Sequence, residues 1–228
     1  MCKKLFFLAF ALLSCNALFS QDVIPSINPI QKRDKPFRIA AGIKVGGGLS
    51  LPTDPTIVTP AYPSGYVLDF KNGLALQAGV VGNIHFGRRQ DSSPGGTGWF
   101  GAEAEVLYGL RTLGAEQESL TMHCVEIPVL LQVYPIPSLA IEAGATFVKY
   151  LKCAPERLQI GEQAINISQF GEASDVMLSI GANYKIPAGI MLDLRYNLGT
   201  SSLAGNFDSK TSTFMASIAY LFSFGKQN

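Results

Sequence analysis

The chain has 228 residues and a net charge of +1, and only 15% of its residues are charged, so it lacks the basic surface that nucleic acid requires. Hydrophobic residues make up 47% of the sequence and the mean hydropathy is +0.22, which is high for a water-soluble protein. Past the N-terminus, no apolar run approaches the roughly 18–20 residues of a membrane-spanning helix. The apolar residues are therefore spread along the chain, and a helical membrane protein is excluded.

Residues 1–20 have the layout of a secretory signal peptide. Lys3 and Lys4 precede an apolar stretch at 5–13, and small and polar residues follow it. An N-terminal membrane anchor is the alternative, but the stretch is short for one. Cleavage is expected near the end of this segment. The tetrapeptide that ends at Cys15 loosely matches a lipoprotein processing box, which leaves lipidation of that cysteine as a second outcome.

Residues 21–36 are rich in Pro, Lys and Arg and predict a flexible periplasmic leader without a core of its own. Removal of the signal peptide would leave two cysteines, Cys124 and Cys153. In an oxidising compartment these two either form a disulfide or remain isolated thiols, because connectivity cannot be deduced from sequence. Their spacing fits no metal site, and neither a metal nor a cofactor is expected.

From residue 37 onward, apolar residues alternate with small or polar ones in successive segments. Alternation with period two places the two sets on opposite faces of a β-strand. The segments are 37–46, 76–86, 100–108, 126–133, 141–147, 175–184, 190–197 and 214–224. Eight is the smallest even number of strands usual for a transmembrane barrel. Residues 37–228 are therefore expected to form one all-β domain, an antiparallel transmembrane β-barrel of about eight strands.

The connections between these segments alternate in length. Residues 135–138 and 186–189 contain turn-forming Pro, Ser and Gly. Longer loops are expected at 51–68, 111–121, 153–172 and 200–212. Such barrels have short periplasmic turns and long extracellular loops, although residues 88–98 are long for a periplasmic turn. Pro128 lies inside a predicted strand and predicts a local bulge, since proline cannot donate to the ladder.

Within each predicted strand, one set of alternate residues carries charges and glycines, whereas the other set carries aliphatic and aromatic residues. This arrangement favours a membrane barrel over a soluble lipocalin-like barrel, because a narrow lumen accepts the first set and lipid accepts the second. The inward charged residues are Arg38, Lys44, Glu103, Glu105, Glu126, Glu142, Asp193 and Arg195. Buried charges need partners, so they are expected to form a structural salt-bridged network. A selective pore or a proton-responsive gate is the alternative.

Tyrosines lie near the ends of several predicted strands and predict the aromatic girdles of a membrane barrel. They are Tyr108, Tyr134, Tyr184, Tyr196 and Tyr220. The segment 220–224 resembles the C-terminal strand signal of outer-membrane proteins. The expected location is the outer membrane of a Gram-negative bacterium, with outer-membrane lipid as the surrounding partner.

Three passages resemble the PorT-like family of outer-membrane barrels from Bacteroidota. The passage 99–108 is similar to the third strand of that family, 125–131 with 141–144 to its central hairpin, and 192–199 to its penultimate strand. The resemblance implies the same barrel topology and a Bacteroidota-like source. The namesake is an accessory factor of type IX secretion, and the resemblance assigns no catalytic residue.

Few residues suggest enzymatic chemistry. His123 near Ser119 could act as a general base, but nothing in the sequence orients it, and a non-enzymatic protein is expected. The expected function is a structural or interaction barrel whose extracellular loops, 51–68 and 153–172, bind partners. An accessory role in protein secretion is the more specific alternative, and a small pore is the third.

Overall fold

The computed structural model describes the β-strands of the chain together with the shortest connections between them. The described residues are 37–59, 62–67, 71–86, 99–114, 119–155, 157–160, 163–166, 173–186, 188–200 and 207–224. The predictions for the signal peptide, the leader, Cys15 and residues 88–98 lie outside these ranges. Among the described residues, no helix is long and apolar enough to cross a membrane.

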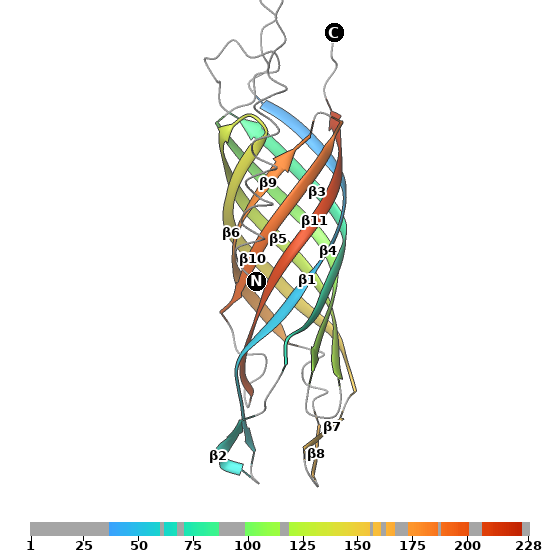
Figure 1. The fold of residues 1–228 in the computed structure, drawn as a ribbon, viewed down its shortest axis with the longest axis vertical. Coiled ribbons are helices and arrows are strands. Elements are labelled where there is room, and N and C mark those ends of the chain that lie inside the picture. Colours follow the sequence, from blue (N-terminus) through green and yellow to red (C-terminus); the bar gives the residue numbers. More distant parts are fainter. Residues whose placement is uncertain are drawn as a thin grey trace, which may run out of the picture. The chain divides into compact units, whose positions relative to one another are not determined.

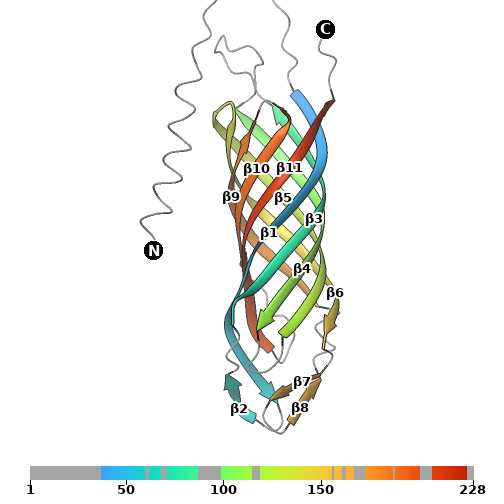
Figure 2. The same cartoon turned by 45° about the vertical axis from the view of Figure 1, so that its right-hand side comes forward.

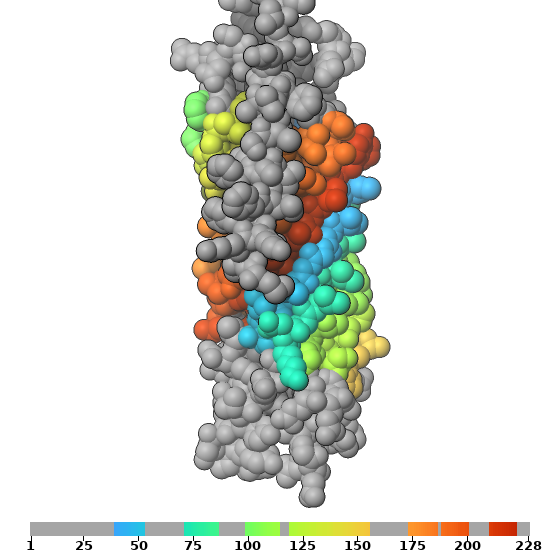
Figure 3. Space-filling view, in the orientation of Figure 1, coloured from blue at the N-terminus to red at the C-terminus, as the bar shows by residue number. Residues whose placement is uncertain are grey.

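Eight long antiparallel strands close into a barrel (Figures 1 and 2). They are β1 (Phe37–Thr59), β3 (Gly73–Phe86), β4 (Phe100–Gly114), β5 (Ser119–Ile136), β6 (Leu139–Ala154), β9 (Ser174–Lys185), β10 (Ile190–Gly199) and β11 (Phe207–Phe224). Each strand pairs with its neighbour in chain order, and β11 pairs back with β1 to complete the ring. Figure 3 shows β11, β1 and β3 side by side on the outer surface. The predicted eight-stranded barrel is confirmed.

Burial alternates from one residue to the next along the strands. Ile43 is 58% exposed and Leu131 is 69% exposed, whereas their neighbours Lys44 and Leu130 are 1% and 0% exposed. Most large exposed side chains are thus apolar, while many charged side chains are buried inside the ring. A water-soluble barrel has the opposite distribution. The outer face therefore suits lipid, and closure leaves no unpaired strand edge in the hydrocarbon.

Two tight turns lie at one end of the barrel. Residues 137–138 join β5 to β6, and a turn from Ile186 to Gly189 joins β9 to β10. Gly189 has a φ of 85°, a backbone conformation that glycine adopts without steric cost. Its backbone also bonds to the next strand, since Leu221 N donates to Gly189 O at 2.8 Å. Because periplasmic turns are short in such barrels, we assign this end to the periplasm.

At the opposite end, the strands continue through segments that were expected to be loops. β1 is 23 residues long and pairs with β2 (Tyr62–Val67), and β4 and β5 extend until residues 115–118 separate them. A separate two-stranded sheet consists of β7 (Arg157–Ile160) and β8 (Gln163–Asn166). Figures 1 and 2 place β2, β7 and β8 at the same end. The strands therefore extend into the predicted long loops, because paired hairpin strands satisfy their own backbone hydrogen bonds.

The bulge predicted at Pro128 is absent, and a bulge lies elsewhere. On both sides of Pro128, β5 keeps the same register with β4 and with β6. Pairing with β4 is interrupted at Ile127 and Pro128 without a shift in register, and proline lacks the N–H donor that this pairing needs. The register between β5 and β6 shifts between His123 and Cys124, where Leu151 is the extra residue on β6.

Candidate functional site in the barrel lumen

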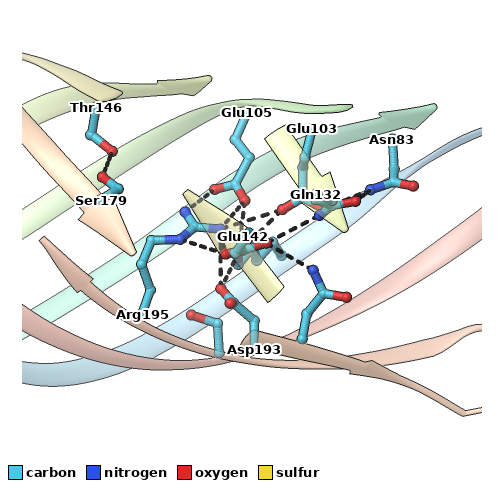
Figure 4. Close-up of polar contacts among 12 residues, drawn as sticks. Asn83, Glu103, Glu105, Gln132, Glu142, Thr146, Ser179, Asp193 and Arg195 are labelled. Atoms are coloured by element: carbon cyan, nitrogen blue, oxygen red, sulfur yellow. Dashed lines mark hydrogen bonds and ion pairs between the residues drawn. The ribbon is translucent and has the colours of Figure 1, made fainter. Parts of the chain in front are cut away.

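A network of buried charged side chains crosses the middle of the lumen (Figure 4). Two cations, Lys44 from β1 and Arg195 from β10, contact carboxylates from three strands. The carboxylates are Glu103 and Glu105 on β4, Glu142 on β6 and Asp193 on β10. None of the six residues is more than 3% exposed. These strands are separated around the ring, so the ion pairs connect opposite walls of the barrel.

Arg195 is the centre of the network. Its Nη2 and Nη1 donate to the two oxygens of Glu105 at 2.9 and 3.2 Å, the bidentate geometry that suits a planar guanidinium. Its Nε donates to Glu142 Oε1 at 3.0 Å, which links β10 to β6. Nη2 also lies 3.3 Å from Glu103 Oε1. One guanidinium thus joins three strands.

Lys44 contacts three of the same carboxylates from β1, which is separated from β10 by β11 alone. Its Nζ donates to Glu105 Oε1 at 2.7 Å and to Asp193 Oδ2, and it lies 4.0 Å from Glu103 Oε1. Glu105 is therefore shared by both cations. The lysine connects β1 to β4 and β10, so the network as a whole spans β1, β4, β6 and β10.

Neutral amide side chains donate to the second carboxylate oxygens of Glu103 and Glu142. Asn83 Nδ2 and Gln132 Nε2 each donate to Glu103 Oε2 at 2.9 Å. Gln132 and Asn183 donate to Glu142 Oε2 at 3.1 and 2.8 Å. A buried carboxylate that accepts several hydrogen bonds can remain charged away from water. The amides also extend the network to β3, β5 and β9.

Lys185 is a third cation that faces the lumen, and the sequence pattern did not predict it. It contacts the network through Asn83. Its Nζ donates to Asn83 Oδ1 at 2.9 Å and to the hydroxyl of Tyr134 at 2.8 Å, and it lies 2.5 Å from Nε2 of His85. Tyr134 is 0% exposed, so its assignment to an aromatic girdle was wrong. Every second residue from 175 to 183 was predicted to face inward. Extension of the same alternation by two residues would have identified Lys185.

Glu126 lies in a separate cluster nearer the extracellular end. Arg111 from β4 donates to Glu126 Oε1 through Nη2 at 2.7 Å and through Nε at 3.1 Å. Nη1 of the arginine donates to the hydroxyl of Tyr150 at 3.2 Å. Arg111 was missed because it was placed in a loop. Because β4 continues to Gly114, Arg111 lies on the same inward face as Glu103 and Glu105.

The other predicted site residues are placed as follows. Arg38 pairs with His85 in the β1–β3 register, and its side chain lies outside the described part of the chain. Cys124 and Cys153 are both buried free thiols, so the disulfide that the sequence allowed is not formed in this structure. Cys153 is opposite Met122 rather than Cys124. Within the described residues, no group of three or more His, Cys, Asp or Glu could hold a metal.

His123 lies on the outer face of the barrel. Its Nδ1 is 2.6 Å from the hydroxyl of Tyr108, which is 50% exposed. The Ser119 partner considered from sequence is not the group to which this nitrogen bonds. The structure therefore places the imidazole beside a girdle tyrosine at the lipid-facing surface.

Comparison with known proteins finds solved structures that are similar to this chain in fold alone. No protein-family model matches the sequence, and no curated protein matches it. Ail, the attachment invasion locus protein of Yersinia pestis, is similar over 81% of this chain and 99% of its own, at 15% identity and a TM-score of 0.41. Neisserial surface protein A is similar over 82% and 98%, at 10% identity and a TM-score of 0.47.

Two further similar structures correct the expectation that the protein is not an enzyme. The outer membrane enzyme PagL matches over 78% of this chain and 97% of its own, at 12% identity and a TM-score of 0.40. The Escherichia coli outer membrane protease OmpT matches over 83% and 97%, at 12% identity and a TM-score of 0.36. Because barrels of this kind include enzymes, the exclusion of an enzyme was wrong. The chain is an outer-membrane type of β-barrel, a fold that hosts both classes.

Proposed function

We propose that the protein is an outer-membrane scaffold with a plugged lumen, which presents its extracellular hairpins to a partner outside the cell. The observation that carries this proposal is the network around Arg195, which joins β4, β6 and β10 across the lumen with buried side chains. Side chains rather than water normally fill an eight-stranded barrel. A transport route through the lumen would have to break these ion pairs, whereas an external binding surface leaves them intact.

Conductance in planar bilayers separates the scaffold from the small pore. Reconstituted protein is expected to give no discrete current steps, because Lys44 and Arg195 form buried ion pairs with carboxylates inside the lumen. The control is the Arg195→Met variant, in which the bidentate contact with Glu105 is lost. Discrete steps from the wild-type protein that scale with salt concentration would contradict the plugged lumen.

The hairpins beyond the barrel are the proposed partner surface. β1 continues to Thr59 and pairs with β2, and β7 and β8 form their own sheet. Extended backbone edges of this kind can accept a strand from a partner. Replacement of residues 157–166 by a Gly-Ser turn should abolish a cross-link formed in intact cells, and heat-modifiable gel mobility should stay unchanged. A cross-linking pattern identical to that of the wild type would argue against this surface.

An accessory role in type IX secretion is the second candidate, in a Bacteroidota-like bacterium. The passages that resemble the PorT-like family lie in β4, β5, β6 and β10. They contribute most of the central network, namely Glu103, Glu105, Glu142, Asp193 and Arg195. The test is deletion of the gene followed by analysis of secreted proteins. This role predicts that cargo is retained inside the cell, and normal secretion would exclude it.

The proposal includes export by the signal peptide at 1–20 and removal of that segment before the barrel inserts. N-terminal sequencing of the mature protein from outer membranes should find a start near residue 21. Labelling with a radioactive fatty acid should leave the protein unlabelled. A lipidated N-terminus at Cys15 would replace this part of the proposal.

A further inference from the structure

The charges of the central network do not balance. Its four carboxylates contact two cations, Lys44 and Arg195, which leaves an excess of two negative charges. Among the described side chains, Lys185 is the next cation, and it reaches the network through Asn83, which itself donates to Glu103. With Lys185 counted, one negative charge is left over. A buried charge without compensation is severely unfavourable, so a further positive charge is expected in this part of the lumen.

One carboxylate oxygen of the network lacks a hydrogen-bond donor, and it belongs to Asp193. Its Oδ2 contacts both Lys44 and Arg195, whereas its Oδ1 is buried without a partner. Every carboxylate oxygen of the three glutamates in the network accepts at least one hydrogen bond. Two cations beside one carboxylate stabilise its ionised form. Oδ1 of Asp193 is therefore a charged oxygen that needs a positive partner.

A second oxygen without a partner lies on the residue directly opposite. Asn183 on β9 pairs with Asp193 on β10, and both side chains are buried. Nδ2 of Asn183 donates to Glu142 Oε2 at 2.8 Å, which fixes the amide, because only its NH2 group can donate to a carboxylate. Its Oδ1 is buried and has no donor. Cross-strand side chains on one face have Cβ atoms about 4.5–5.5 Å apart, so one ligand can contact both oxygens.

A hydroxyl extends this row of oxygens to a third strand. Ser217 on β11 is opposite Asp193 on the other side and is 5% exposed. Its Oγ accepts a hydrogen bond from Gln77 Nε2 at 2.9 Å, and a hydroxyl oxygen has a second lone pair. Neighbouring positions on β9, β10 and β11 thus carry an amide, a carboxylate and a hydroxyl oxygen.

We propose that Asp193, Asn183 and Ser217 bind an alkali metal cation, for which sodium is the probe. Carboxylate and carbonyl oxygens are the ligands that hard cations take. A monovalent ion balances the one negative charge that is left over, whereas calcium takes about six to eight oxygen ligands and usually several carboxylates. The set contains a single acidic residue, so it differs from the clusters of His, Cys, Asp and Glu that are absent from the described residues.

The lumen differs in polarity on the two sides of this row. Toward the periplasm, Val81, Met191 and Ala219 form a buried apolar cluster. Toward the extracellular end, β1, β10 and β11 carry buried neutral side chains that each have an oxygen without a partner, namely Ser50, Asn197 and Thr211. Such oxygens can replace part of the hydration shell of a cation, and apolar side chains cannot. The cation is therefore expected to enter from the extracellular end.

Urea titration in lipid vesicles tests the site with sodium alone as the ligand. Choline replaces sodium at constant pH and ionic strength, and heat-modifiable mobility separates folded from unfolded protein. A ligand that binds only the folded state raises the ratio of folded to unfolded protein. Above its dissociation constant, each tenfold increase in sodium is expected to raise this ratio of the wild-type protein about tenfold.

Two variants and a control locate the site. Asp193→Asn removes the charge and supplies an N–H that can donate to Asn183, so the sodium dependence should be lost. Ser217→Ala keeps every charge and should shift the rise to several-fold higher sodium concentrations. Glu126→Gln is the matched control, because it removes a buried carboxylate in the separate cluster of Arg111. Whatever the stability of this control, its sodium dependence should equal that of the wild type.

Four results would overturn the proposal. A wild-type ratio that is the same in sodium and in choline would exclude the site. An undiminished sodium dependence of folded Asp193→Asn or of Ser217→Ala would place the cation elsewhere. A ratio that rises on acidification and not with sodium would mean that Asp193 binds a proton instead. A rise with calcium chloride at far lower concentrations than with sodium would identify a divalent site. The inference is independent of the partner proposed for the hairpins.

Discussion

At the scale of single residues, the stability of the lumen depends on a few side chains that have several partners each. Arg195 contacts Glu105, Glu142 and Glu103 at distances of 3.3 Å or less. A buried cation of this kind is expensive to desolvate, so a well-packed apolar substitute for the whole set could be equally stable. Removal of the cation alone is different, because it leaves several carboxylates without their partner.

The Arg195→Met variant should therefore lower the free energy of unfolding by about 3–5 kcal/mol. Urea titration in lipid vesicles with heat-modifiable mobility as the readout measures this change. The matched control is the double variant Arg195→Met/Glu105→Gln, which also removes one of the carboxylate charges left without a partner. It should recover part of the lost free energy of unfolding. Equal stability of the single variant and the wild type would show that the ion pairs do not hold the barrel together.

Glycines on the inward face set how closely neighbouring strands approach. A Cβ added to Gly144 would lie 2.1 Å from Val129 O and 2.9 Å from Leu130 Cα. Gly82 lies on the outward face, and a Cβ added to it would have its nearest contact at 3.7 Å, the backbone oxygen of Ala104, which is an ordinary van der Waals distance. The two positions therefore compare the same substitution at the lumen face and at the outer face.

We expect Gly144→Ala to destabilise the barrel by about 1–3 kcal/mol, because backbone atoms of β5 must move. Gly82→Ala should have an effect within about 0.5 kcal/mol or be slightly stabilising. The same urea titration compares the two variants. If both substitutions had the same cost, close packing at the lumen face would not explain the glycine content of this parity.

At the scale of strands, alternation was sufficient to predict which segments form strands and which face is polar. It failed at irregular points for identifiable reasons. Pro128 was expected to cause a bulge, but a strand can lose one donor without a shift in register. The actual bulge at Leu151 depends on pairing between β5 and β6, which a single segment of sequence does not contain. Strand ends were also underestimated, which hid Arg111 and Lys185.

The bulge leads to a prediction about single-residue deletions. Deletion of Leu151 removes the extra residue and leaves Lys152 and Cys153 on their present faces, so the barrel should still fold. Deletion of Phe147, in the regular part of β6, shifts every residue on one side of it to the opposite face and should abolish folding. Heat-modifiable mobility of the two variants is the measurement. Two variants that fail to fold alike would show that the extra residue is not at position 151.

At the scale of the whole molecule, the sequence predicted the barrel and the face on which the charges lie, but not their connections. Which carboxylate meets which cation depends on the shear of the closed sheet, and this separates Glu126 from the central group and gives it to Arg111. The disulfide could not be decided for a similar reason, because the register places Cys153 opposite Met122. The hairpins beyond the barrel, by contrast, are set by local pairing of the end of β1 with β2 and of β7 with β8.

The central claim is that the apolar face of the barrel contacts lipid while the charged face fills the lumen. The chain has a single tryptophan, Trp99, so the variant Trp99→Phe/Val129→Trp carries one fluorophore at the middle of the outer face. In vesicles of lipids brominated at the middle of their acyl chains, we expect strong quenching of this fluorophore and weaker quenching of native Trp99. An unquenched tryptophan at position 129, in protein that remains soluble, would mean that the two faces are inverted and that the barrel is not a membrane protein.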